Sequence, residues 1–570
     1  MKITLRSNGF FNHGALLEKH LKKRIPVELC EDGLLVELAV NKALGKAESY
    51  EITPVDGGYT ITGADEAGLY YGIGKFLHSA QWTETAFVPD PPKGVVTPAC
   101  SFRATYFAVH FYNWYQQAST EDLEDYLEEM LLWGYSTIIG IVPVVNLSTL
   151  EEPLFFSSVN KVKRVFALCR KLGMKTGLIV TINVGLKAAP EALSASQELF
   201  RSRTRHRMIC TSKPEGLAYM RELWTDLLGS FQDVGLDYLV TWPYDEGGCT
   251  CKDCRTWGAN GYVKACNAFG ETAKQLYPNA QFIISTWLFD TEFYGAQYGE
   301  ESEFEGFYRH LKTELAWVDY IMVDGHGEKP YPQYPLEHEV VKPVINFPEI
   351  SMYGLYPWGG FGANPLPKHF QRIWDSSKHI LQGGLPYSEG IYEDILKVQF
   401  SGYYWTPEKN YREILSEYIN YEYSSEVCEE VLLLMELIEE NHILVATNCQ
   451  PRLKPALMAK TLADTVNAKL SERAKGAWRW RILYIRAQLD VKRYRYYFDH
   501  KMSSQRDLVK LRSRSAILLK DDPEAQEMFR ELCQCYCCVD YNTENRWTHP
   551  PVNGGDPSDT FENMKGIIND

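Results

Sequence analysis

The chain has 570 residues, of which 45% are hydrophobic, 13% aromatic and 23% charged. This composition supports several hydrophobic cores and excludes an intrinsically disordered or fibrous protein. The 74 Asp and Glu residues outnumber the 59 Lys and Arg residues, for a formal net charge of −15. Because nucleic acids are bound mainly through clustered cations, we expect no nucleic-acid partner.

The sequence contains no recognisable signal for export or for membrane insertion. The opening residues, MKITLRSNGFFNHG, contain no apolar stretch of the length of a signal peptide, and about 18 uncharged apolar residues never run together. We therefore expect a cytoplasmic protein without a membrane partner, in which most of the 14 cysteines are reduced thiols. The sequence leaves the oligomeric state open.

Residues 1–95 predict a small α+β domain. Short β-rich runs separated by polar breaks precede a helix-like stretch at 67–79, and the runs lie at 26–29, 34–38, 50–53 and 59–62. The segment 88–94, VPDPPKG, continues neither a helix nor a sheet because its prolines lack a backbone N–H. We expect this segment to be the linker to the next domain.

Residues 96–404 alternate apolar runs of strand length with helical patterns. Buried parallel strands are continuous apolar runs that need crossover helices, so the alternation predicts a (β/α)8 TIM barrel. A doubly wound open sheet is the alternative, since periodicity does not show closure. The eight strand candidates are 102–111, 136–144, 176–184, 237–244, 281–288, 320–323, 342–347 and 379–385, and the helix candidates include 121–133, 161–172, 215–231, 262–277 and 304–315.

Residues 405–570 predict a helical C-terminal domain. The strand signal stops after position 405, and charged amphipathic segments follow at 411–421, 426–440, 474–497 and 523–535. The fold class expected for the whole chain is therefore α/β, with a central barrel between a small α+β domain and a set of helices.

Polar and aromatic residues gather at the predicted carboxyl ends of the barrel strands, where barrel enzymes carry their active sites. Aromatic faces stack on the C–H faces of sugars and carboxylates accept sugar hydroxyls, so this rim suits a polyhydroxylated ligand. Motifs for phosphate or dinucleotide binding are absent, which disfavours a kinase or a dehydrogenase. The candidate ligand-binding residues are His110, Asn183, Trp242, Tyr244, Trp287, Asp324, His326, Trp358, Tyr387 and Glu389.

Several of these residues have a structural alternative. Tryptophans belong to cores more often than to binding walls, and a single histidine in an apolar run is usually a satisfied core residue. Glu389 has the alternative of capping the helix that follows it, since carboxylates are favoured at helix N-termini.

The most informative stretch is 236–248, LDYLVTWPYDEGG, in which Asp245 and Glu246 end the fourth strand candidate. Two adjacent carboxylates disfavour each other's charge, so one of them is expected to keep its proton near neutral pH, as a general acid requires. A solvated acidic patch is the alternative for such a pair in a random loop. Its place at a strand end, between aromatics and two glycines, favours catalysis.

An Asp-Glu pair at the end of the fourth barrel strand resembles that of glycoside hydrolase family 20, the β-N-acetylhexosaminidases, and is similar to that of the family 123 β-N-acetylgalactosaminidases. The stretch 63–77, GADEAGLYYGIGKFL, is similar to the end of the domain before the family 20 barrel, and Phe102-Arg103 is similar to the Tyr-Arg that opens its first strand. The first strand lacks the Gly, Asp and Ser-Arg-His of family 20. We therefore expect a distant or separate family of the same clan.

This resemblance implies a retaining exo-β-N-acetylhexosaminidase that uses substrate-assisted catalysis and requires no cofactor. The acetamido oxygen of the substrate attacks C1, Asp245 holds the acetamido N–H, and Glu246 is the acid and then the base. By the same resemblance Arg103 binds O3 and O4 of the sugar, although a salt bridge inside the barrel bottom is its alternative. The expected partner is a glycan or glycoside with a terminal N-acetylhexosamine, with GalNAc favoured over GlcNAc.

Two other functions are compatible with the same residues. One is a barrel glycosidase of another specificity, such as an α-glucuronidase-like enzyme with a similar small N-terminal domain. The other is a non-catalytic carbohydrate-binding protein. The intact Asp245–Glu246 pair argues against the second.

Three cysteines follow the acidic pair with a spacing that suits a soft metal ion: Cys249, Cys251 and Cys254. Structural zinc sites use four ligands, so Cys266 or Cys210 would have to supply the fourth. The alternative is that these thiols simply pack in the loop. A structural zinc ion is therefore possible on sequence grounds, but it is not required.

Overall fold

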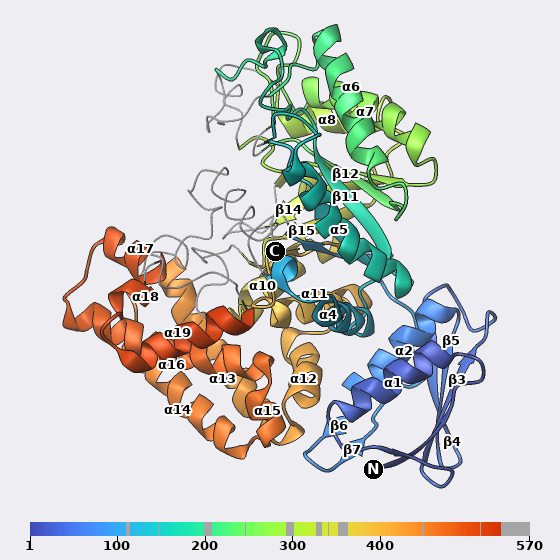
Figure 1. Cartoon of the computed structure of the whole chain (residues 1–570), viewed down its shortest axis with the longest axis vertical. Helices are drawn as coiled ribbons and strands as arrows, with labels where there is room; N and C mark the ends of the chain where they lie inside the picture. The colour runs from blue at the N-terminus through green and yellow to red at the C-terminus, as the bar shows by residue number, and fades with distance from the viewer. Residues whose placement is uncertain are drawn as a thin grey trace.

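The structure, a computed structural model, describes residues 1–109, 114–145, 147–198, 208–244, 247–291, 301–325, 333–339, 341–351, 363–446, 450–513 and 515–536. Within these ranges no helix is both long and apolar enough to cross a membrane. The chain forms a central barrel with an N-terminal α+β unit and a group of C-terminal helices at the same end (Figure 1).

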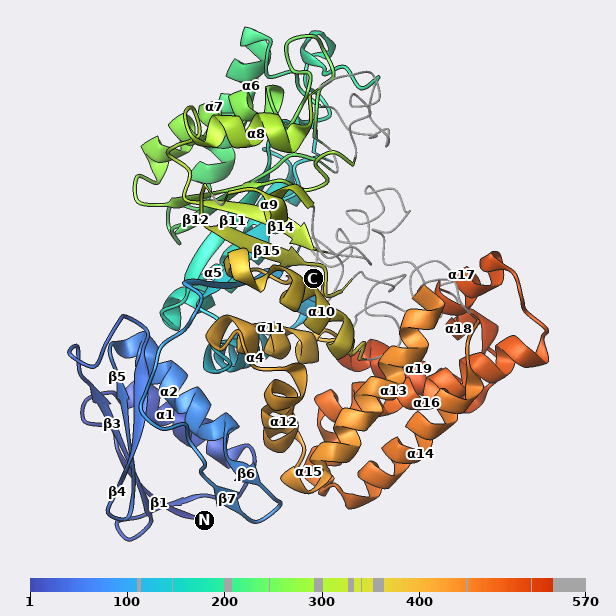
Figure 2. The ribbon, with the colours of Figure 1, turned by 180° about the vertical axis from the view of Figure 1, so that it is seen from behind.

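The N-terminal unit is a sheet with strand order β2-β1-β3-β5-β4-β8, covered by two helices on one side (Figure 2). The helix α2 begins after Asp65, whose side chain accepts a hydrogen bond from the Gly68 N–H. A Cβ at Gly74 would lie 1.9 Å from Leu132 O, so this glycine lets α2 approach the barrel closely. The elements are β1 (Lys2–Arg6), α1 (Phe11–Lys22), β2 (Glu28–Leu29), β3 (Leu34–Val40), β4 (Tyr50–Val55), β5 (Gly58–Gly63), α2 (Glu66–His78), β6 (Gln81–Trp82), β7 (Phe87–Val88) and β8 (Val95–Val96).

The predicted (β/α)8 barrel is confirmed, and all eight strand candidates are strands. Parallel pairing runs in chain order from β10 to β16, then from β16 to β9, and β9 pairs with β10. This last pairing closes the sheet and excludes the open doubly wound alternative. The strands are β9 (Phe102–Phe107), β10 (Thr137–Ile141), β11 (Lys175–Thr181), β12 (Tyr238–Trp242), β13 (Gln281–Ser285), β14 (Tyr320–Gly325), β15 (Val344–Pro348) and β16 (Leu381–Gly384).

The helices between the strands cover the outside of the barrel, which is why the strands are apolar on both faces. A short strand, β17 (Tyr387–Ser388), continues the eighth position and pairs with the carboxyl end of β9. The described barrel helices are α3 (Trp114–Gln117), α4 (Thr120–Leu132), α5 (Pro153–Lys171), α6 (Pro214–Gly229), α7 (Gly261–Leu276), α8 (Glu303–Leu311), α9 (Gln333–Glu337), α10 (Pro367–Ser377) and α11 (Asp394–Trp405).

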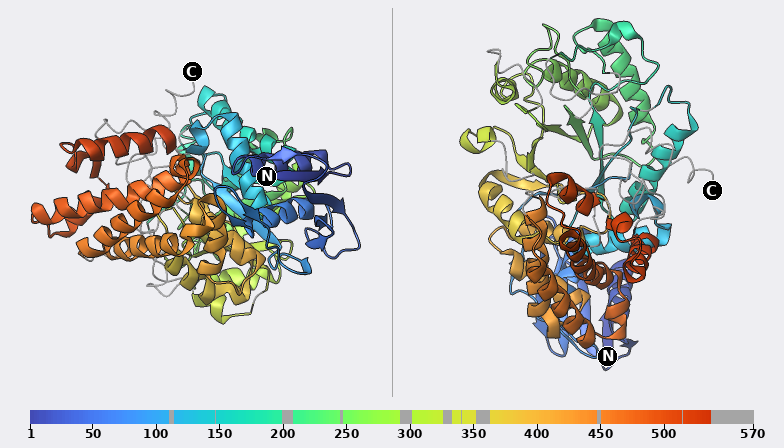
Figure 3. Two further views of the ribbon diagram at one scale, coloured as in Figure 1. Left: turned by 90° about the horizontal axis from the view of Figure 1, so that it is seen from below. Right: turned by 90° about the vertical axis from the view of Figure 1, so that its left-hand side faces the viewer.

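The predicted C-terminal helices are confirmed as well. In the view from below, these helices extend to the left and the N-terminal unit lies to the right (Figure 3, left). The helix α12 leads into the group and also contacts α2. The helices are α12 (Tyr411–Glu422), α13 (Cys428–Ala446), α14 (Leu453–Lys469), α15 (Glu472–Gly476), α16 (Trp478–Asp499), α17 (Gln505–Ser513), α18 (Ser515–Leu518) and α19 (Pro523–Tyr536).

A buried ionic network joins these helices to the barrel. Arg479 on α16 lies 2.7 Å from Asp394 on α11, and it also binds Glu129 on α4. Glu422 on α12 lies 3.7 Å from the same guanidinium and pairs with Arg24 of the N-terminal unit. Because burying a charge is unfavourable unless it is paired, this network fixes how the three parts of the chain meet.

Candidate active site

The carboxyl end of the barrel contains five aromatic rings that we call the aromatic floor: Tyr106, Trp242, Trp287, Phe347 and Tyr387. Phe347 on β15 is central, with ring centroids 5.1 Å from Trp242, 5.6 Å from Trp287 and 5.6 Å from Tyr387. Tyr106 stacks on Tyr387 at 5.1 Å, and Trp242 lies 5.3 Å from Trp287. All five side chains are buried. Three predicted ligand-binding residues, Trp242, Trp287 and Tyr387, are thus brought together.

Glu389 follows β17 beside this floor and is buried. The Tyr387 hydroxyl donates a hydrogen bond to Oε1 of Glu389, whereas Oε2 has no hydrogen-bond partner within the described structure. Burial raises the pKa of Glu389 well above its ordinary value, and the carboxylates Glu393 and Glu349 raise it further, although the bond from Tyr387 opposes them. Burial therefore favours the protonated form of this carboxyl group.

Hydrogen bonds from α11 and Tyr115 fix the segment that carries Glu389. Lys397 on α11 donates to Gly390 O at 2.7 Å and to the Tyr115 hydroxyl at 2.7 Å, and that hydroxyl lies 2.7 Å from Ser388 Oγ. The alternative function of Glu389 as a helix cap is wrong, because Glu393 is the N-cap residue of α11. The carboxyl group of Glu389 is thus buried beside the floor and does not cap this helix.

The pH dependence of stability is expected to report the neutral state of Glu389. Because the pKa of Glu389 is higher in the folded state than in the unfolded state, its contribution to stability is fully present below the ordinary pKa of a glutamate. This contribution is lost as the pH rises through the folded-state pKa. We expect Glu389→Gln to lose less stability than the wild type between pH 5 and pH 8, measured by urea unfolding. Glu408→Gln, at an exposed position, is the control and should follow the wild type. Parallel curves for Glu389→Gln and the wild type would contradict the assignment.

Asp324 lies at the end of β14, as the sequence predicts. Its Oδ1 atom is buried, and desolvation raises its pKa to about 7. The strands β14 and β15 are neighbours, and Asp324 is in register with Phe347 of the aromatic floor. A second carboxyl group that holds its proton near neutral pH therefore lies in the strand layer of the floor.

Tyr244 anchors the chain immediately before Asp245. Its hydroxyl donates a hydrogen bond to Glu303 Oε1 at the start of α8, and Glu303 also accepts from Gly258 N at 2.8 Å and from Asp290 N at 2.8 Å. Burial raises the pKa of Glu303 to about 7. On the other side of the acidic pair, a Cβ at Gly247 would lie 2.2 Å from Pro243 O. Both flanks of the pair are therefore tightly packed.

Asn183 has a structural role, which corrects the expectation that it binds the substrate. Its Nδ2 donates to Ile209 O and to Gly248 O, both at 2.9 Å, and its Oδ1 accepts from Gly248 N at 2.8 Å. The side chain is fully buried. It clamps the segment around Ile209 to the loop after β12.

Arg103 lies at the amino end of β9, away from the aromatic floor, and this corrects its expected contact with O3 and O4 of a sugar. The guanidinium binds Glu48 Oε2 at 3.0 Å, Gly134 O at 2.9 Å and Cys100 O at 3.0 Å. It is fully buried. Arg103 therefore forms the salt bridge that the sequence left as its alternative, and it attaches the N-terminal unit to the barrel bottom.

The remaining candidates are divided between two groups. Asp245, Glu246, His110, His326 and Trp358 lie outside the described residues. Cys249, Cys251 and Cys254 lie in the loop after β12, close to Cys210.

The sequence reasoning missed Tyr106 and Phe347 as part of the floor. Phe347 ends the strand candidate 342–347, and this position could have identified it. Tyr106 lies in the middle of the candidate 102–111, and only its pairing with Tyr387 places it in the floor.

Solved structures of glycoside hydrolases share the fold of this chain. No family model and no curated protein matches the sequence. A family GH115 4-O-methyl-α-glucuronidase with specificity for decorated arabinogalactans matches with a TM-score of 0.58 and 9% identity over 98% of this chain and 78% of that chain. A family 89 enzyme from Clostridium perfringens, solved with its substrate GlcNAc-α-1,4-galactose, matches with a TM-score of 0.58 and 12% identity over 90% and 65%.

Solved structures of family 20 match the chain as well. The β-N-acetylhexosaminidase from Streptomyces coelicolor A3(2) has a TM-score of 0.47 and 12% identity, over 74% of this chain and 91% of that chain. The chain shares the barrel fold with hydrolases of several families.

Proposed function

We propose that this chain is a retaining exo-β-N-acetylhexosaminidase of the glycoside hydrolases. The observation that carries the proposal is Glu389, a buried glutamate beside the aromatic floor whose pKa is raised by burial and whose Oε2 has no hydrogen-bond partner within the described structure. Aromatic faces and a hydroxyl-binding carboxyl group are the features that a sugar site needs. In the sequence two residues separate the pair Asp245–Glu246 from Tyr238–Trp242, the strand β12, and we assign the catalytic groups to this pair.

The proposed reaction uses the acetamido group of the substrate as the nucleophile. Its carbonyl oxygen attacks C1 while the bond from C1 to the leaving oxygen breaks, and Glu246 gives its proton to that oxygen. Asp245 accepts a hydrogen bond from the acetamido N–H and stabilises the positive oxazolinium ring. Glu246 then removes a proton from water, which attacks C1 and reopens the ring with net retention. This sequence belongs to the substrate-assisted exceptions to the two-carboxylate scheme.

Glu389 is suited to bind a hydroxyl group of the terminal sugar. Tyr387 donates to Oε1, so Oε2 is the oxygen that we assign to the ligand. We assign this group to the O4 or O6 hydroxyl of the terminal sugar, and we favour GalNAc over GlcNAc. A neutral acid binds a hydroxyl without the full desolvation cost of a buried charge.

A panel of aryl glycosides tests the proposal. We expect hydrolysis of the aryl β-GalNAc and β-GlcNAc substrates, release of the β-anomer first by NMR, and no hydrolysis of the matched β-galactoside, which lacks the acetamido group. Hydrolysis of an α-glucuronide alone would instead identify the α-glucuronidase-like alternative. Binding of N-acetylhexosamines without turnover of any substrate would identify a carbohydrate-binding protein.

A further inference from the structure

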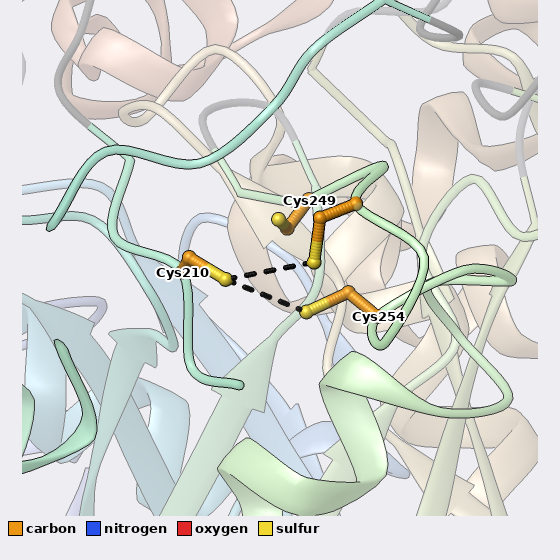
Figure 4. A group of neighbouring side chains, drawn as sticks. Cys210, Cys249 and Cys254 are labelled. Carbon is orange, nitrogen blue, oxygen red and sulfur yellow. Dashed lines mark hydrogen bonds between the residues drawn. The ribbon is translucent and has the colours of Figure 1, made fainter. Parts of the chain in front are cut away.

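Two segments of the chain meet beyond the end of β12, and each contributes at least one cysteine. Cys210 lies in the segment before α6, and Cys249, Cys251 and Cys254 lie in the loop between β12 and α7. Their four Sγ atoms all lie within 4.8 Å of one another. Figure 4 shows Cys210 facing the cysteines of the other segment across a small gap. The fourth cysteine of the group is therefore Cys210 and not Cys266.

Two of the sulfur–sulfur distances match those of a tetrahedral metal site. Cys210 Sγ lies 3.7 Å from Cys251 Sγ and 3.9 Å from Cys254 Sγ. Zinc binds thiolates at about 2.3 Å, so the sulfur atoms of a tetrahedral zinc site lie about 3.8 Å apart. A disulfide would bring two sulfurs to about 2.05 Å, and all four cysteines are free.

The two segments are held together without the metal, so the sulfur atoms are brought into place by the fold. Asn183 binds the backbone of both segments, as described above. Ser212 Oγ donates to Asp253 O at 3.1 Å, and the Thr250 N–H donates to Ser196 O at 2.8 Å. A donor set arranged in advance in this way loses little conformational entropy when it binds an ion.

Donors around the group suit the negative charge of four thiolates. Ser212 Oγ lies 3.1 Å from Cys254 Sγ. The ammonium group of Lys264 lies 3.3 Å from Ser212 Oγ. Such donors stabilise thiolate ligands and their orientation.

We propose that Cys210, Cys249, Cys251 and Cys254 bind one structural Zn²⁺ ion. Four sulfur ligands complete a tetrahedral shell and leave no open position for chemistry, and soft thiolates select zinc over magnesium or calcium. The ion cross-links the segment before α6 to the loop that begins directly after Glu246, and so stiffens one flank of the catalytic pair. Zinc binding is independent of the proposed glycosidase activity.

The metal content of the purified full-length chain tests this site. After zinc loading and gel filtration we expect about one zinc ion per chain, measured by inductively coupled plasma mass spectrometry. Cys210→Ser should lose at least nine-tenths of the bound zinc, whereas Cys266→Ser should keep it. Cys266 is the matched control, because it is buried on α7 nearby with its Sγ 3.5 Å from Thr241 Oγ1. Loss of zinc in Cys266→Ser with retention in Cys210→Ser would overturn the assignment.

A second measurement uses only the wild-type chain, in case the variants do not fold. Replacement of zinc by Co²⁺ should produce the visible absorption of tetrahedral cobalt with a strong thiolate charge-transfer band. The metal should also protect four thiols from a disulfide reagent until a chelator is added. A metal-free protein after zinc loading, or a disulfide between any two of the four cysteines under reducing purification, would overturn the proposal.

Discussion

Replacement of Glu246 by Gln is expected to lower kcat about 10²- to 10⁴-fold for N-acetylhexosaminides with poor leaving groups, because general acid catalysis contributes a factor of this size. Gln has the shape of Glu but no proton to give to the leaving oxygen. Aryl substrates whose leaving groups need no protonation should lose much less. The measurement is kcat for an alkyl and for a nitrophenyl glycoside of the same sugar.

The control for this variant is Glu215→Gln, at an exposed position in the first turn of α6, which should leave both rates unchanged. We expect the wild type to have an acidic to neutral optimum whose basic limb follows the proton on Glu246, and the Gln variant to lack that limb. Equal losses for both leaving groups, or an unchanged pH profile, would show that Glu246 is not the acid.

Replacement of Arg479 by Met is expected to have the largest effect on folding. The change leaves Asp394, Glu129 and Glu422 buried without their shared cation. Removing one partner of a buried ion pair costs about 3–5 kcal/mol, because the remaining charge is uncompensated. The free energy of unfolding, measured with urea at pH 7, should fall by about this amount.

The destabilisation by Arg479→Met should also depend on pH. Although burial opposes it, the charge of Arg479 lowers the pKa of Glu129, so the pair stabilises the fold above the ordinary pKa of Glu and this contribution is lost as the pH falls. The variant should therefore be closer to the wild type at pH 4 than at pH 7. Arg481→Met on the same helix is the control, because its pair with Glu531 is partly exposed, with side-chain exposures of 27% and 30%, and should contribute less than about 1 kcal/mol. Equal losses for both arginines would contradict the role of the network.

The barrel could be predicted from the sequence because its strands are buried on both faces. Runs such as 237–244 are continuous and apolar, and each run lies between strong helical patterns. The helix α1 was missed because its N-cap residue, Phe10, makes no side-chain cap bond and its first turn has no acidic residue. Closure of the sheet was also out of reach, since it depends on the pairing of β9 with β10 across the barrel.

The grouping of residues at the rim was predictable from strand position, whereas contacts between residues distant in sequence were not. Trp242, Trp287, Tyr387 and Glu389 meet because parallel strands end at one rim. Arg103 was misassigned because its partner, Glu48, comes from another domain. The fourth cysteine had the same difficulty, since Cys210 precedes Cys251 by 41 residues and only the fold brings them together.

The affinity for a thiazoline mimic of the oxazolinium intermediate tests the proposed mechanism most directly. If the acetamido oxygen is the nucleophile, the thiazoline should inhibit the wild type at a concentration at least about 100-fold below that of the free N-acetylhexosamine product, since analogues of transition states and intermediates bind 10²- to 10⁸-fold more tightly than substrates. Asp245→Ala should abolish most of this advantage, because the ring nitrogen loses its partner. Inhibition by the thiazoline no stronger than by the free sugar would contradict substrate-assisted catalysis in this chain.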